Sequence, residues 1–127
     1  MAEGRGKEMK YKLWFDEDKG VLYIKTFGML SKPEIDRLMA EIKKSFEGKT
    51  HRYILANVSD SPVELIDKEA RQIYRKYAPE ANFEKIAIVG ASPTTRMIAK
   101  VAIAVFGKTD ITRFFKDEDE AFVWLKR

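Results

Sequence analysis

Two short apolar runs decide the fold of this chain, YILANV at residues 53–58 and IAIVG at residues 86–90. Each run has the length of a β-strand and is apolar at nearly every position. A strand with one side facing solvent alternates apolar and polar residues, whereas a strand that is covered on both sides is apolar throughout. The two runs therefore predict buried, parallel strands at the centre of a sheet.

The residues around these runs predict further elements. Residues 11–15 and 21–27 are rich in β-branched and aromatic side chains and flank an acidic turn, so they predict a hairpin. Capping residues, apolar residues at three-four spacing and terminating residues predict the helices. We expect helices from about Lys32 to Gly48, from Asp67 to Pro79 and from Ser92-Pro93 to about Phe106. A strand is expected from Ile111 to Phe115, followed by a last helix that is capped by residues 117–120 and ends at Leu125.

The element order β-β-α-β-α-β-α-β-α predicts an α/β fold. We expect a single-layer, mostly parallel five-stranded sheet with an antiparallel first strand and four helices, because right-handed crossovers return each parallel strand to the same sheet. The pattern leaves the order of the strands open. Residues 1–10 are expected to form a flexible tail and residues 11–127 one domain, which at this length needs neither a metal nor disulfides for stability.

The composition excludes several classes of site. The chain has no cysteine and one histidine, which excludes disulfides, zinc–cysteine clusters, iron–sulfur ligation and two-histidine catalysis within one chain. We therefore expect no cofactor and no metal. The net charge is +4, but the two signs alternate along the chain and no basic stripe is interleaved with aromatic residues. For this reason we do not expect nucleic acid as a partner.

The chain also lacks the apolar runs that are typical of secreted and membrane proteins. Residues 1–10 contain no apolar run of about 7–15 residues, which a signal peptide requires. The stretch from Met97 to Phe106 is interrupted by Lys100 and has about half the length of a membrane span. We therefore expect a cytoplasmic protein without a transmembrane segment.

The last part of the chain carries a more specific pattern. Residues 115–125, FKDEDEAFVWL, are similar to the F-x-D-x-x-x-A-x-x-W-L ending of SpoIIAA-like proteins. Together with the element order, this ending makes residues 11–127 resemble the STAS/SEC14-like group that is related to the sporulation anti-sigma-factor antagonist SpoIIAA. The resemblance implies a small non-enzymatic domain whose members bind proteins, nucleotides or, in the SEC14 branch, apolar ligands.

The chain departs from the antagonist branch of this family at one place. There the resemblance implies a phosphorylated serine directly after an aspartate, at the start of the helix that follows the third strand. Here Asp67 is followed by the run KEA at residues 68–70, so that serine is missing in this register. Ser59 and Ser61 lie earlier in the same connection but outside the expected context. We therefore do not carry the phosphorylation switch over to this chain.

Polar side chains gather where two of the predicted parallel strands end. Ligands of open α/β sheets bind beyond the carboxyl ends of the strands, which here are residues 57–62 and 90–96. An arginine and the free amides of a helix start would attract negative charge. The structural alternative is that these residues only form a turn and a helix cap. The candidate site for a small polar or anionic ligand comprises Asn57, Asp60, Ser61, Ser92, Thr94, Thr95 and Arg96.

Catalysis is not expected from these residues. His51 lies in a helix-to-strand loop at the opposite end of the sheet, and a serine–histidine–aspartate arrangement would require it to cross the domain. The enzymatic alternative is a phosphate-transfer or hydrolytic site built from Asp60, Ser92 and Arg96.

The helix that follows Ser92 is apolar on nearly all sides. Its charged residues are Arg96 and Lys100, whereas a surface helix needs only one apolar stripe. Either neighbouring elements of the domain cover its second face, or this face binds another subunit or protein. An apolar ligand pocket or a membrane surface is a further alternative. The candidate interface residues, for which a two-fold dimer is the simplest assembly, are Met97, Ile98, Val101, Ile103 and Phe106.

These features predict a non-catalytic cytoplasmic binding module that acts through protein–protein interaction. We expect a regulatory role and self-association as a homodimer through the third helix. The alternative is a carrier or sensor of a small apolar or amphipathic ligand, which the SEC14-like relatives imply.

Overall fold

The elements of the chain follow the order that the sequence predicts. The computed structural model describes residues 11–27, 32–60, 83–105, 107 and 109–127. The predicted helix between Asp67 and Pro79 lies outside the described residues, and so do residues 1–10. The elements are β1 (Tyr11–Asp16), β2 (Val21–Thr26), α1 (Lys32–Ser45), β3 (Tyr53–Asn57), β4 (Lys85–Val89), α3 (Pro93–Val105), the 3-10 helix η2 (Thr109–Ile111), β5 (Thr112–Phe115) and α4 (Glu118–Leu125).

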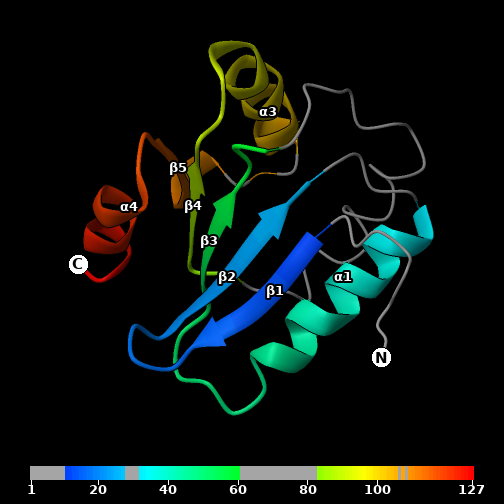
Figure 1. Cartoon of the computed structure of the whole chain (residues 1–127), viewed down its shortest axis with the longest axis vertical. Helices are drawn as coiled ribbons and strands as arrows, with labels where there is room; N and C mark the ends of the chain where they lie inside the picture. The colour runs from blue at the N-terminus through cyan, green and yellow to red at the C-terminus, as the bar shows by residue number, and fades with distance from the viewer. Residues whose placement is uncertain (1–10, 28–31, 61–82, 106, 108) are drawn as a thin grey trace.

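One five-stranded sheet contains all of these strands, in the order β1-β2-β3-β4-β5. β1 pairs antiparallel to β2, whereas the other three pairs are parallel. The predicted fold class is therefore confirmed. The strand order, which the sequence leaves open, is the same as the order along the chain, so β1 lies at one edge of the sheet and β5 at the other (Figure 1).

Helices α1 and α4 lie on opposite faces of the sheet (Figure 1). Successive residues of a strand point to opposite faces. In β2, Leu22 and Ile24 therefore pack with α1, while Val21 and Tyr23 pack with α4. The residues of β3 divide in the same way. This arrangement explains why the central strands are apolar at consecutive positions, because both of their faces are buried.

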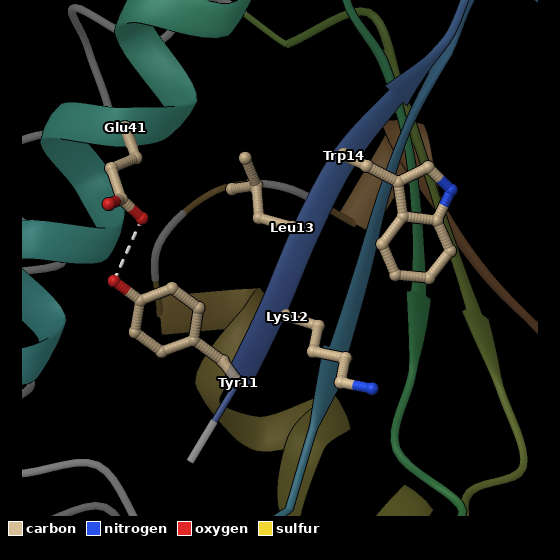
Figure 2. A pocket seen from close by; sticks show the side chains of 5 residues that line it. All are labelled: Tyr11, Lys12, Leu13, Trp14 and Glu41. Carbon is tan, nitrogen blue, oxygen red and sulfur yellow. Dashed lines mark hydrogen bonds between the residues drawn. The ribbon is translucent and has the colours of Figure 1, made fainter. Parts of the chain in front are cut away.

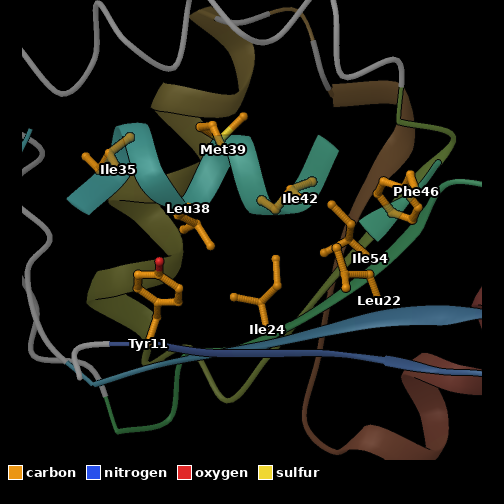
Figure 3. Packing of buried hydrophobic residues seen from close by; sticks show 9 residues of the cluster. All are labelled: Tyr11, Leu22, Ile24, Ile35, Leu38, Met39, Ile42, Phe46 and Ile54. Atoms are coloured by element: carbon orange, nitrogen blue, oxygen red, sulfur yellow. The ribbon is translucent and has the colours of Figure 1, made fainter. Parts of the chain in front are cut away.

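The first helix buries the regular apolar stripe that the sequence predicts. Gly48, the predicted terminating residue, has a φ of +77°, a conformation that commonly ends helices. The core on this face contains Ile35, Leu38, Met39, Ile42 and Phe46 together with Tyr11, Leu22, Ile24 and Ile54 (Figure 3).

The last helix closes the opposite face. Asp117 caps α4, because its Oδ1 accepts a hydrogen bond of 2.9 Å from the backbone N–H of Glu120. Ala121, Trp124 and Leu125 are buried against the sheet. β5, which precedes this helix, begins one residue later than predicted, because residues 109–111 form η2.

Candidate functional site

Asn57, the last residue of β3, is the centre of a hydrogen-bond network. The residue is 9% exposed. Its Oδ1 accepts hydrogen bonds from the backbone N–H and the hydroxyl of Ser59, at 3.0 and 2.6 Å. Its Nδ2 donates to Oε2 of Glu118 at 2.8 Å and to the hydroxyl of Tyr23 at a longer 3.5 Å. Both polar atoms of this buried amide thus have partners within the protein, as buried polar groups generally do.

Glu118 is the first residue of α4, and its side chain reaches the end of β3. Burial raises the pKa of its carboxyl group above the usual value of 4.5, and the negative charge of Asp119 raises this pKa further. The sequence suggests a helix cap for residues 117–120, but the structure gives the cap to Asp117 and joins Glu118 to Asn57. No local pattern could find this contact, because its two residues are 61 positions apart.

The two loops of the candidate site meet at Ser59 and Gly90. Gly90 has a φ of +84°, and a Cβ atom at this position would lie 2.6 Å from the Cβ of Ser59. The backbone N–H of Val58 donates to the carbonyl of Val89 at 2.9 Å, and the N–H of Gly90 donates to the carbonyl of Phe115 at 3.3 Å. Glycine is therefore required both by the backbone conformation and by the lack of space.

Ser92 caps α3, as the sequence predicts for a helix start. Its Oγ accepts a hydrogen bond of 3.1 Å from the backbone N–H of Thr95, and its hydroxyl is 3.0 Å from Oγ1 of the same threonine. Thr94 is exposed. The guanidinium carbon of Arg96 lies 5.5 Å from the centre of the Phe114 ring, and its Nε is buried without a hydrogen-bond partner among the described residues.

The structure therefore divides the predicted ligand site into separate groups. Asp60 forms an ion pair of 3.2 Å with Lys25 of β2. Between the described residues, no hydrogen bond or ion pair joins Asn57 or Asp60 to Arg96. Ser61 lies outside the described residues. A ligand-binding role for this set of residues stays a prediction.

The described side chains of helix α3 lie outside both cores. The two core clusters contain none of its described residues, and the described element that it contacts most is η2. Met97 is 69% exposed, and Ile103 is partly buried. The side chains of Ile98, Val101 and Phe106 lie outside the description.

An aromatic pair that the sequence analysis did not single out lies on the sheet face that α4 shares. Trp14 of β1 stacks on Tyr23 of β2, with ring centres 4.2 Å apart and an angle of 17° between the rings. α4 packs on β3, β4 and β5, and Trp14 is 44% exposed. In the sequence, Lys12, Trp14 and Asp16 alternate with apolar residues. This alternation indicates a strand with one face exposed to solvent.

The remaining candidates are placed as follows. His51 lies before β3, at the opposite end of that strand from Asn57, as expected. Its Nδ1 is 3.1 Å from Oε1 of Glu84, and its ring stacks on Tyr53. Within the described ranges, no group of three or more histidine, cysteine, aspartate or glutamate residues could hold a metal ion. The helices found in these ranges are all too short or too polar to cross a membrane.

Solved structures with the same fold cover almost the whole chain. A Shewanella loihica PV-4 protein with a SpoIIAA-like fold matches with a TM-score of 0.71 and 16% identity, over 96% of this chain and 99% of that chain. The unphosphorylated anti-sigma factor antagonist SpoIIAA matches with a TM-score of 0.61 and 15% identity, over 91% and 96% of the two chains. A STAS domain protein from Planctomyces limnophilus has a TM-score of 0.59 and 14% identity, over 91% and 96%.

These identities are too low to transfer more than the fold. A comparison with curated protein sequences finds no match. A comparison with known protein families, in contrast, matches residues 21–126 to the SpoIIAA-like family. Because this match spans most of the sequence, the chain belongs to the SpoIIAA-like family.

Proposed function

We propose that the chain is a non-catalytic, regulatory binding module of the cytoplasm that docks a partner protein on α3. The observation that carries this proposal is the 69% exposure of Met97, on a helix whose described residues belong to neither core. The sequence of this helix contains only two charged residues, Arg96 and Lys100. A protein partner would remove the exposed Met97 side chain from water, which is favourable.

The relatives in fold support a protein as the partner. SpoIIAA is an anti-sigma factor antagonist, and an antagonist of an anti-sigma factor acts on another protein. At 15% identity only the class of partner is taken from this relative, and not the residues that bind it.

The carboxyl edge of the sheet supports a non-catalytic role. A phosphate-transfer or hydrolytic site would need Asp60, Ser92 and Arg96 to converge on one substrate. Instead, Asp60 is paired with Lys25, Ser92 caps α3, and Arg96 lies against Phe114. Each of the three groups is thus engaged in a contact of its own.

An apolar-ligand carrier is the less favoured function. Such a carrier needs a cavity with an apolar lining. The hollow beside β1 has a volume of about 360 Å³ and is lined by Tyr11, Lys12, Leu13, Trp14 and Glu41. It is largely open to solvent, whereas a carrier encloses most of the surface of its ligand.

The test uses native mass spectrometry of the protein purified from its own cells. Met97→Lys places a charge on the exposed side of α3, and Val123→Lys is a matched control, because Val123 is 66% exposed on α4. We expect wild type and Val123→Lys to retain the same partner protein in a fixed ratio and Met97→Lys to lose it. Circular dichroism would show that both variants are folded.

The masses also distinguish the alternatives. A dimer that Met97→Lys dissociates would show that the partner is a second copy, which is the self-association that the sequence predicts through this helix. A reproducible small-molecule mass on the monomer would favour the carrier. Wild-type protein without any protein partner, or a Met97→Lys variant that keeps every partner of the wild type, would contradict the proposal.

A further inference from the structure

The outer edge of β1 is open in the part of the chain that the structure describes. β1 pairs with β2 on one side, and its other side has no strand beside it. Such an edge presents unpaired backbone N–H and C=O groups that can pair with another chain. A hollow of about 360 Å³ lies along this strand and is lined by Tyr11, Lys12, Leu13, Trp14 and Glu41 (Figure 2).

The side chains of β1 alternate between two different surfaces. Leu13 and Phe15 point to the α1 face, where they pack partly buried against the core. Lys12, Trp14 and Asp16 point to the opposite face, and Lys12 and Trp14 are exposed there (Figure 2). One face of this edge strand therefore carries apolar side chains. The other face carries a positive charge, an aromatic ring and a negative charge, in the order Lys12, Trp14 and Asp16.

Lys12 is placed next to another cation. In the register of the hairpin it lies directly opposite Lys25, and like charges at opposed positions are destabilising. Lys25 is neutralised by Asp60, whereas Lys12 has no ion pair with a described carboxylate and lies 5.9 Å from the centre of the Phe27 ring. An anion on the open side of β1 would offset this repulsion.

Asp16 is suited to supply such an anion. Its Oδ1 accepts a hydrogen bond of 3.1 Å from the backbone N–H of Lys19, which fixes the carboxylate at the end of β1. Among the described residues, its second oxygen is not used in a hydrogen bond. Lys12 and Asp16 are equally far from Trp14 along the strand, so a two-fold axis at Trp14 brings one onto the other.

We propose that a second copy of this chain pairs antiparallel with β1 about a two-fold axis at Trp14, which joins two sheets into one. In this register, Lys12 lies opposite the partner's Asp16, Leu13 lies opposite the partner's Phe15, and Trp14 lies opposite the partner's Trp14. The pairs between residues 12 and 16 are thus salt bridges, apolar contacts or an aromatic contact, the pairs that stabilise adjacent strands, while Tyr11 lies opposite the partner's Glu17, beyond the end of β1. The interface is isologous and closes after two copies.

The charges select this register and this occupant. A register centred on Leu13 would place Lys12 opposite Trp14, so that Lys12 would have no anion opposite it. A register centred on Lys12 would place the two lysines against each other. The proposal is independent of the role of α3, because it uses only the hairpin edge.

The test is sedimentation equilibrium of the purified protein over a range of concentrations. In the dimer, Lys12→Glu places a carboxylate opposite the partner's Asp16 at both symmetry-related positions. We therefore expect the dissociation constant of the dimer to rise about tenfold. The same substitution places opposite charges across β1 and β2 at Lys25, so a loss of dimer cannot come from an unstable monomer. The double variant Lys12→Glu/Asp16→Lys exchanges the charges, and we expect it to dimerise again more tightly than Lys12→Glu.

Met97→Lys serves as the control on the other proposed surface. We expect this variant to keep the dimer of the wild type. A wild-type protein that stays monomeric, a Lys12→Glu variant that dimerises like wild type, or a double variant that is not restored would overturn the proposal. A dimer that is lost in Met97→Lys and kept in Lys12→Glu would assign self-association to α3 instead.

Discussion

The side-chain amide of Asn57 donates a hydrogen bond of 2.8 Å to Oε2 of Glu118. This contact ties the end of β3 to the first turn of α4, and it uses a buried amide that also holds Ser59. The position is the one where an open α/β sheet offers a ligand site. In this chain an internal polar network occupies the end of β3, and we expect this network to contribute to the stability of the fold.

Replacing Asn57 tests the energetic role of the network. Asn57→Leu keeps the size of the side chain but leaves the carboxylate of Glu118 and the N–H of Ser59 without their partner. We expect the free energy of unfolding to fall by about 2 kcal/mol, the usual cost of an unsatisfied buried polar group. Urea denaturation measures this change. Glu118→Gln, which keeps an acceptor for Asn57, should cost clearly less, and an equal loss in both variants would contradict the expectation.

The raised pKa of Glu118 predicts a direction for the dependence of stability on pH. Above the unfolded-state pKa of about 4.5, the native state retains the proton of Glu118 longer than the unfolded state does. This group therefore adds stability at low pH, and its contribution is lost as the pH rises through the raised native pKa. Glu118→Gln lacks the effect. The unfolding free energy of wild type minus that of the variant should fall as the pH rises above about 4.5.

Asp119 gives the control for this pH effect. Its negative charge is the second cause of the raised pKa, after burial. Asp119→Asn should therefore lower the pKa of Glu118 and narrow the pH range over which stability changes. A titration of the Glu118 carboxyl group by NMR would measure both quantities, and an unchanged pKa in Asp119→Asn would contradict the assigned cause.

Substitutions at Gly90 and Gly48 distinguish two costs of adding a methyl group, backbone strain and a steric clash. Both have positive φ angles, +84° and +77°, but only at Gly90 would the new Cβ meet another atom, the Cβ of Ser59 at 2.6 Å. Gly48→Ala should lose about 1 kcal/mol from backbone strain alone. Gly90→Ala should lose about 3 kcal/mol, because the clash displaces the loop that follows β3. Thermal denaturation of the two variants compares them, and equal losses would show that the loop gives way freely.

Tyr11 and Tyr53 provide a matched pair for the hydrogen bond at the edge strand. The hydroxyl of Tyr11 donates to Oε1 of Glu41 at 2.8 Å, and burial with this contact raises its pKa to about 12. Tyr11→Phe should cost about 1 kcal/mol, the net value of such a bond. Tyr53→Phe, for which no hydroxyl bond is described, should change stability little. Absorbance titration should show that the variant at Tyr11 loses the phenol whose pKa is raised to about 12.

The elements that the sequence predicts well are those whose signals are local. Burial on both faces makes β3 and β4 apolar at consecutive positions, and this pattern needs no knowledge of the neighbouring strands. Ser92 and Asp117 cap their helices through backbone groups three residues away, so their side chains could be assigned from spacing alone.

The features that the sequence does not predict depend on contacts between distant segments. The pattern of β-strands does not say which strands are neighbours, so the strand order had to come from the structure. The partners of Asn57 and Asp60 are Glu118 and Lys25, and each lies on another element. The residues that the sequence groups into one candidate ligand site are therefore engaged in separate tertiary contacts.

Because the strands are neighbours in the order of the chain, each new strand can add to the strand that was made before it. Such a topology keeps the sequence separation of strand contacts lower than a topology that pairs distant strands, which favours faster folding. The two cores draw on different parts of the chain, because the buried residues of the α1 core lie at positions 11–54, whereas the other core includes Leu125 together with Val21. During synthesis, the layer beneath α1 can therefore form first, and the layer beneath α4 closes the fold as its final step.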